Sequence, residues 1–122
     1  MGDVKIDAMD SVTMKDSIAY AANDKNTSEL NTVKIIGTNN VNLHNSAVNA
    51  RGNVDIKAVT NDANNNQTVS GNIKISSDLD ADGKNQTVIK AGDKLSIQGK
   101  NTTLDKASLV YKQVKFYNDG VK

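Results

Sequence analysis

The sequence contains no cysteine, no proline and no tryptophan, and only 3% of its residues are aromatic. Without cysteine the chain forms no disulfide bond, which is compatible with a long exported chain that crosses a membrane unfolded. Its four aromatic rings belong to Tyr20, Tyr111, Phe116 and Tyr117. A globular core normally contains more aromatic bulk than this, so the composition favours a core of small aliphatic side chains in stacked layers.

Long apolar runs and strong charge of either sign are also missing. No run approaches the roughly 20 apolar residues of a membrane-spanning helix, and the first residues lack the regions of a signal peptide. The formal net charge is +1, and lysine alternates with aspartate instead of forming a basic patch. We therefore expect neither a membrane span nor a nucleic-acid partner.

What the sequence does contain is a repeat: a Gly-Asn or Gly-Asp pair followed by aliphatic residues that alternate with polar ones. It occurs at Gly2–Ile6, Gly52–Ile56, Gly71–Ile75 and Gly92–Ile97, with weaker copies at Val33–Ile35 and Val114–Phe116. The copies recur at nearly equal intervals, except that the first interval, from Val4 to Val33, is longer than the others. A regular period of about 20 residues indicates a solenoid, in which each repeat buries its apolar side against its neighbours.

The alternation within each copy predicts a β-strand, because successive side chains of a strand point to opposite faces. A second short strand follows in Val12–Met14, Val41–Leu43 and Thr102–Leu104, and then a third apolar position at Ile18, Val48 or Leu109. Asn, Asp and Gly supply the corners between strands. We predict an all-β domain over residues 1–122: a right-handed parallel β-helix of five to six coils, each of about 20 residues.

The predicted register depends on a tetrapeptide, Asn-Gln-Thr-Val, that occurs at 66–69 and at 85–88. The spacing of its two copies equals the interval from Val54 to Ile73 and predicts that these two residues lie on adjacent coils. The segment 21–31 accounts for the long first interval and the segment 60–67 is too polar for the interior, so both are expected to leave the coil. The predicted core consists of Val4, Ile6, Val12, Met14, Val33, Ile35, Val41, Leu43, Val54, Ile56, Ile73, Ile75, Leu95, Ile97, Val114 and Phe116.

Two stretches carry a resemblance to a known family. Gly-Asp-Val-Lys-Ile-Asp-Ala-x-Asp-Ser-Val-Thr-Met, from Gly2, and Val-Lys-Ile-Ile-Gly-Thr-Asn-Asn-Val-Asn-Leu-His-Asn-Ser, from Val33, resemble filamentous haemagglutinin repeats. Those repeats form the β-helical shafts of large bacterial exoproteins that are exported by two-partner secretion. The amino-terminal secretion domain of that family carries Asn-Pro motifs, and this sequence has no proline, so the likeness extends to the shaft alone.

The resemblance implies a secreted or surface-attached protein that acts in adhesion, in virulence or as the stalk of a contact-dependent toxin. Its expected partners are neighbouring coils of a longer chain, a second copy end to end, and a host or bacterial cell surface. Met1 followed directly by a repeat leads us to expect a fragment of a longer shaft. The alternative is a self-assembling β-helical filament protein similar to the bacterial bactofilins.

Asp78, Asp80 and Asp82 are the only candidate metal ligands. Asp-Leu-Asp-Ala-Asp-Gly matches the first half of a calcium loop, in which alternate carboxylates converge on one hard cation. The twelfth position of that loop is Ile89 instead of a bidentate glutamate. The missing ligand favours the alternative of a solvated corner between coils, and calcium is the only cofactor for which the sequence offers a hypothesis.

No catalytic residues are predicted, and we expect no enzyme. His44 is the only histidine and Arg51 the only arginine, and neither lies next to a nucleophile or a metal set in the sequence. His44 is expected at an outward strand position. Four Asn-x-Ser/Thr sequons begin at Asn26, Asn66, Asn85 and Asn101. For Asn66 and Asn85, which the repeat places one above the other, a hydrogen-bonded asparagine ladder is the preferred role over glycosylation.

Overall fold

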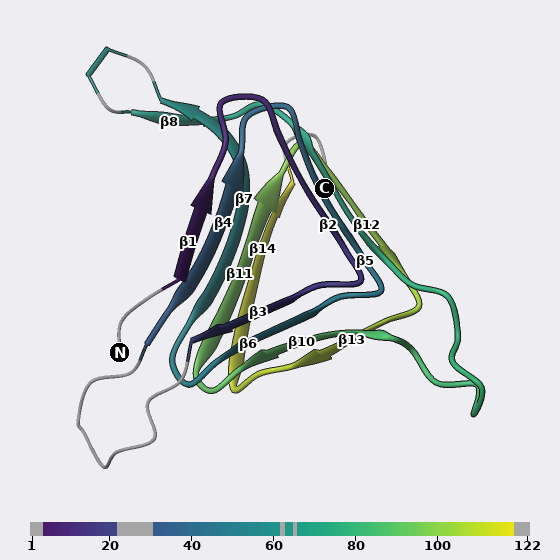
Figure 1. Cartoon of the computed structure of the whole chain (residues 1–122). Helices are drawn as coiled ribbons and strands as arrows, with labels where there is room; N and C mark the ends of the chain where they lie inside the picture. The colour runs from purple at the N-terminus through teal and green to yellow at the C-terminus, as the bar shows by residue number, and fades with distance from the viewer. Residues whose placement is uncertain (1–3, 22–30, 62, 65, 119–122) are drawn as a thin grey trace.

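The computed structural model describes residues 4–21, 31–61, 63–64 and 66–118. Every regular element in these ranges is a β-strand, and the strands form three parallel sheets with one antiparallel hairpin. Seen along its axis, the molecule is a triangle with one sheet on each side (Figure 1). The all-β class with parallel strands is therefore confirmed. The described residues contain no helix that could span a bilayer.

The chain visits the three sheets in turn. The first sheet contains β1 (Val4–Asp7), β4 (Val33–Gly37), β7 (Val54–Asn61), β11 (Lys94–Gly99) and β14 (Gln113–Asn118), with β8 (Gln67–Val69) on the end of β7. The second contains β2 (Ser11–Lys15), β5 (Asn40–His44), β9 (Asn72–Ser76) and β12 (Asn101–Asp105). The third contains β3 (Ile18–Ala21), β6 (Ala47–Ala50), β10 (Thr87–Ala91) and β13 (Ala107–Val110).

The corners between the second and third sheets repeat one backbone conformation. Asp16, Asn45 and Lys106 each follow a strand of the second sheet, and their φ angles are 52°, 51° and 57°. This left-handed region is tolerated by Asp and Asn, whose short polar side chains bond the local backbone, and it is less favourable for lysine. The polar corners expected from the sequence are present at this position of the fold.

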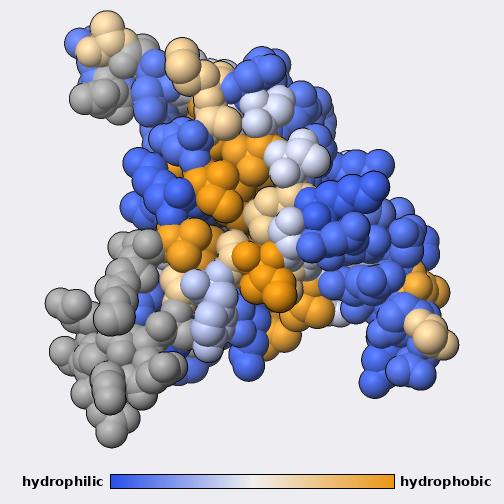
Figure 2. Space-filling view, viewed as in Figure 1, coloured by the Kyte–Doolittle hydropathy of each residue, from blue (hydrophilic) through white to orange (hydrophobic). Residues whose placement is uncertain are grey.

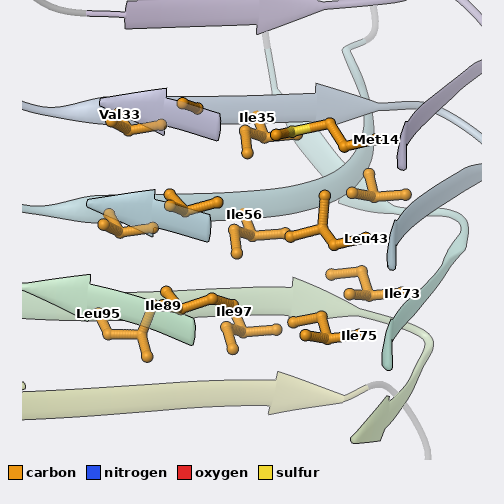
Figure 3. Close-up of a cluster of buried hydrophobic side chains, with 14 of the residues drawn as sticks. Met14, Val33, Ile35, Leu43, Ile56, Ile73, Ile75, Ile89, Leu95 and Ile97 are labelled. Carbon is orange, nitrogen blue, oxygen red and sulfur yellow. The ribbon is translucent and has the colours of Figure 1, made fainter. Parts of the chain in front are cut away.

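The core consists of columns of aliphatic side chains that point into the triangle (Figure 3). Val33, Val54 and Leu95 are register partners on neighbouring strands, and Ile35, Ile56 and Ile97 form the next column. All six side chains are fully buried. Burial of such a side chain contributes about 1.5–3 kcal/mol, so these columns supply much of the stability that the missing aromatic residues would otherwise provide.

The predicted register is wrong in one respect. Val54 pairs with Val33 and Leu95 in the first sheet, whereas Ile73 pairs with Val41 and Thr102 in the second. The tetrapeptide copies also lie apart, since 67–69 is β8 of the hairpin and 87–88 opens β10. The Gly-Asn pair therefore recurs at two different corners of the triangle, and similar local sequence begins strands of different sheets.

The number of residues between register partners on successive strands of a sheet varies more than the interval of the sequence repeat. Along the first sheet the successive register partners are Val4, Val33, Val54, Leu95 and Val114. The step from Val54 to Leu95 is the longest, because it contains two excursions, the β7–β8 hairpin and a loop between β9 and β10. The sequence predicted that the polar segment 60–67 leaves the coil, but it predicted neither the hairpin nor the second excursion. Most of the expected loop 21–31 lies outside the described residues.

The predicted core is largely correct, with differences at its ends. Val4, Ile6 and Val114 are half-buried, and Phe116 is 42% exposed because it lies in the last described layer of the first sheet. Ile18 points outward and is 77% exposed, while its neighbour Ala19 stacks inward on Val48. The third sheet has two inward columns that the predicted list omitted, Ala19, Val48 and Ile89 in one and Ala21, Ala50 and Ala91 in the other.

Asparagines stack in register on successive strands, but at another position than predicted and with a single recorded bond between their amides. Asn40, Asn72 and Asn101 are register partners on β5, β9 and β12. The side-chain amide of Asn101 donates to Asn72 Oδ1 at 3.1 Å, and that of Asn40 donates to Ser11 Oγ at 3.5 Å. Asn66 and Asn85 do not stack, because one flanks the hairpin strand β8 and the other lies between β9 and β10.

Candidate functional site

The predicted carboxylates lie on the loop of residues 77–86, which leaves the triangle between β9 and β10 (lower right in Figure 1). An antiparallel bridge between Leu79 and Asn85 closes this loop, which we call the corner loop. Asp78, Asp80 and Asp82 are all exposed. Among the described residues, no group of three or more His, Cys, Asp or Glu side chains is placed to hold a metal ion.

Asp80 holds the tip of the corner loop. Its Oδ1 accepts hydrogen bonds from the backbone N–H groups of Asp82 and Lys84, both at 2.9 Å. Its own N–H donates to the carbonyl of Lys84 at 2.8 Å, and its carbonyl accepts from the N–H of Gly83 at 2.9 Å. Gly83 has a φ of 76°, a conformation that suits glycine. One carboxylate oxygen of Asp80 is thus committed to a tight turn.

Asp78 bonds the base of the loop to the end of β5 and to the corner that follows β5. Its N–H donates to Asn45 Oδ1 at 2.8 Å, and the Asn45 side-chain amide donates to Asp78 Oδ2 at 3.3 Å. His44 Nε2 lies 3.4 Å from the same oxygen. The hydrogen bond from Asn45, then that from His44, lowers the pKa of the Asp78 carboxyl below its ordinary value.

The imidazole of His44 also contacts Ser76. Its Nδ1 lies 2.9 Å from Ser76 Oγ, so the ring stands between a serine hydroxyl and the carboxylate of Asp78. His44 and Ser76 are register partners on β5 and β9. This cluster was not predicted from the sequence, although an alignment of Val41–His44 with Ile73–Ser76 places the two side chains together.

A serine, a histidine and an aspartate within this reach are the side chains of an acyl-transfer site. Such a site also needs N–H donors near the serine that are free to bind a developing oxyanion. The N–H of Ser77, which follows the serine, already donates to the carbonyl of Asp105 at 3.1 Å. Ser76 itself is only 8% exposed. The cluster is therefore best described as a fastening for the corner loop.

Buried hydroxyl groups extend this hydrogen-bond network beneath the corner. Thr87 Oγ1 donates to the carbonyl of Ser76 at 2.6 Å and accepts from the N–H of Ser46 at 3.2 Å. Ser46 Oγ accepts from the N–H of Ser17 at 3.2 Å. Because Thr87 and Ser46 are fully buried, these bonds satisfy polar groups that would otherwise cost stability. Three successive layers are thus joined at one corner.

The other residues considered from the sequence are Arg51 and the sequon asparagines, and those that the structure describes lie in contacts of the fold. Arg51 lies in the turn between β6 and β7, and its carbonyl oxygen faces Gly92. Of the sequon residues, Asn101 donates its side-chain amide to Asn72 Oδ1, and Asn85 Nδ2 donates to Ser108 Oγ at 3.1 Å. Asn26 lies outside the described residues.

The lowered pKa of Asp78 predicts a pH-dependent contribution to stability. A carboxyl whose pKa is lower in the folded state stabilises the fold above its unfolded pKa, and this contribution disappears as the pH falls through the folded value. We expect Asp78→Asn to be less stable than the parent chain at pH 7, and we expect the difference to shrink below about pH 3.8. Urea unfolding midpoints at pH 7, 4, 3 and 2 measure this difference.

Asp82→Asn is the matched control, because no described residue bonds the Asp82 side chain. It should leave the midpoint unchanged at every pH. A pH-independent difference for Asp78→Asn, or an equal effect of both substitutions, would contradict the stabilising role assigned to the hydrogen bonds of the Asp78 carboxylate.

Calcium binding by Asp78, Asp80 and Asp82 stays a hypothesis, and the bonds of Asp78 and Asp80 favour the structural corner. We expect millimolar calcium to leave the thermal midpoint unchanged, since a carboxylate site without a bidentate glutamate binds weakly. Asp80→Ala should lower the midpoint by removing two backbone bonds, and Asp80→Asn should largely retain it because the amide oxygen still accepts them. A calcium-dependent rise in midpoint that Asp80→Asn abolishes would instead establish the metal site.

Comparisons of this chain with protein-family models, with curated proteins and with solved structures found no match.

Proposed function

We propose that the chain is a right-handed parallel β-helix that serves as a shaft segment of a secreted or surface-attached bacterial adhesin or exoprotein. In this proposal the shaft projects a binding or toxic tip and carries no catalysis of its own. Each passage through the three sheets is one coil, and a right-handed path is the usual hand of parallel crossover connections. The resemblance of the repeats to filamentous haemagglutinin supports the biological setting.

The observation that carries the proposal is the unbroken register of the columns. In all three sheets each strand of the stack pairs in parallel with its neighbours, and most inward positions stack aliphatic on aliphatic residues, with Thr102 on Ile73 as an exception. The triangular core of such a stack has a similar cross-section from layer to layer, and the excursions lie outside it, so further coils can be added along the axis without a new core. This property suits a rigid spacer.

The two ends of the stack support axial contacts. Among the described strands, β1, β2 and β3 pair on one side only, as do β12, β13 and β14 at the other end. Leu104 and Phe116 stand in inward columns, yet they are 43% and 42% exposed. Figure 2, viewed from the β1 end, has hydrophobic residues at its centre and hydrophilic residues around most of its rim. Apolar ends of this kind favour stacking on another coil.

The alternative, a self-assembling filament similar to bactofilins, uses the same ends for polymerisation. Sedimentation velocity and electron microscopy of the purified chain separate the two functions. The shaft predicts monomers and short, concentration-dependent oligomers, whereas ordered filaments of unlimited length would favour the alternative.

Leu104→Lys tests whether the ends carry this association. It should reduce self-association in sedimentation, because it places a charge at the apolar end of the stack. Tyr20→Lys is the matched control, since Tyr20 is 57% exposed on the side of the third sheet. Circular dichroism verifies that both variants remain folded. Equal effects of the two substitutions, or a parent chain that stays monomeric at millimolar concentration, would contradict axial stacking.

A further inference from the structure

A groove of about 360 Å³ lies on the outer face of the first sheet, on the side away from the corner loop. Its floor comes from β1, β4 and β7, and Asn61 and Gln67 of the β7–β8 hairpin form one wall. Figure 1 shows the hairpin projecting from the triangle beside β1. The hairpin exists because β7 continues past Ala58, where its pairing with β4 ends, and then pairs with β8.

Three lysines gather in this groove. Lys5 and Lys34 are direct register partners on β1 and β4, and Lys57 lies on the next strand. Neighbouring strands are about 4.8 Å apart, and like charges directly opposite each other destabilise a sheet. The sheet therefore retains a local repulsion that a bound anion would relieve.

The lysine charges are incompletely compensated. Asp7 is the only acidic residue of the groove, and its Oδ2 lies 3.8 Å from Lys5 Nζ. Within the described residues, neither Lys34 nor Lys57 has an acidic partner within 4 Å. The groove thus holds three positive charges against one negative charge, and Thr38, Asn61 and Gln67 add uncharged hydrogen-bonding groups.

The arrangement also limits the size of the ligand. Asp55 follows Lys34 in the same column, and it would face any extended polyanion that ran on along the axis. The groove therefore suits a compact anion and not an extended polyanion. No arginine lines the groove, so the planar fork that recognises a carboxylate in two bonds is absent from it. Lysine binds phosphate as a point charge and needs no such fork.

We propose that this groove is a binding site for a compact ligand with two phosphate groups, held by Lys5, Lys34 and Lys57. One phosphate lies between the adjacent lysines of β1 and β4, and the second reaches Lys57, about 8 Å diagonally from Lys34 by strand spacing and rise. The proposed site does not depend on the shaft function, because the outward side chains that form it could differ without altering the buried core.

Titration of the full chain with sodium pyrophosphate, followed by amide chemical shifts at constant ionic strength, tests the proposal. We expect saturable shifts confined to residues of β1, β4, β7 and the hairpin, with an affinity in the millimolar range or tighter. Lys34→Gln and Lys57→Gln should each weaken binding at least threefold. Lys74→Gln and Lys90→Gln, exposed lysines on the second and third sheets, are the matched controls and should leave it unchanged.

Citrate and sulfate at the same ionic strength identify the chemistry. Weaker binding of citrate and of the single sulfate group supports a diphosphate ligand, and tighter binding of citrate would overturn that assignment. Shifts of equal size around all exposed lysines, or unchanged affinity in both Lys34→Gln and Lys57→Gln, would overturn the site itself. Spectra of the free variants verify that neither substitution unfolds the chain.

Discussion

Ile56→Asp is expected to unfold most of the chain or to lower its stability by about 4 kcal/mol. Ile56 is fully buried between Ile35 and Ile97 in the middle of the first sheet. The described residues offer no cation in this aliphatic column, so a carboxylate there would lose its hydration without gaining a partner. Because a domain of this size has a total stability of about 5–15 kcal/mol, one such change removes much of it. Urea unfolding measures the loss.

Lys74→Asp is the control for this prediction. It also introduces an aspartate into a β-strand, but Lys74 points outward from β9 and is exposed. Surface substitutions of this kind usually change stability by less than about 0.5 kcal/mol. If Ile56→Asp were tolerated as well as Lys74→Asp, the columns would not form the core.

Gly92→Ala is expected to cost about 3 kcal/mol, near the upper end of the range for overpacking. A Cβ atom at Gly92 would lie 1.9 Å from the carbonyl oxygen of Arg51, a backbone atom of the turn below. That turn cannot move aside freely, because the N–H of Gly92 donates to the carbonyl of Ala50 and the N–H of Asp93 to that of Gly52, both at 2.9 Å. Thermal and urea unfolding of the variant provide the measurement.

Gly83→Ala provides the contrast. No atom lies within 4 Å of a Cβ built at Gly83, but its φ of 76° is unfavourable for alanine. The expected cost is about 1 kcal/mol, from backbone strain alone. A larger effect at Gly83 than at Gly92 would contradict the close approach of backbone at the corners.

These glycines explain why part of the fold was predictable from sequence. Gly71 approaches the carbonyl of Asn39 as Gly92 approaches that of Arg51, so a glycine precedes a strand at both of these contacts between turns. The alternation after each glycine then identifies the strand and its buried face. Both signals are local, and for this reason the stacked strands of the first and second sheets and most of their inward residues were predicted correctly.

Register was harder to predict, because it depends on which corner a glycine occupies. Gly71 opens a strand of the second sheet and Gly92 a strand of the first, although the local sequences are alike. The two excursions in one coil together lengthen it to about twice the usual period, and they made neighbouring sheets appear to be neighbouring coils. The contact of His44 with Ser76 was hidden for the same reason, since it exists only in the correct register.

The lack of native cysteine allows a direct test of this register by paired cysteine substitutions. Lys34 and Asp55 are outward register partners in the first sheet, at a separation that a disulfide can span. The account predicts that Lys34→Cys with Asp55→Cys forms a cross-link on oxidation. Asp55→Cys with Lys74→Cys should not, because Lys74 pairs with Asn42 in another sheet, and Asn42→Cys with Lys74→Cys should confirm that position 74 can react. A cross-link between positions 55 and 74, with none between 34 and 55, would contradict the three-sheet stack.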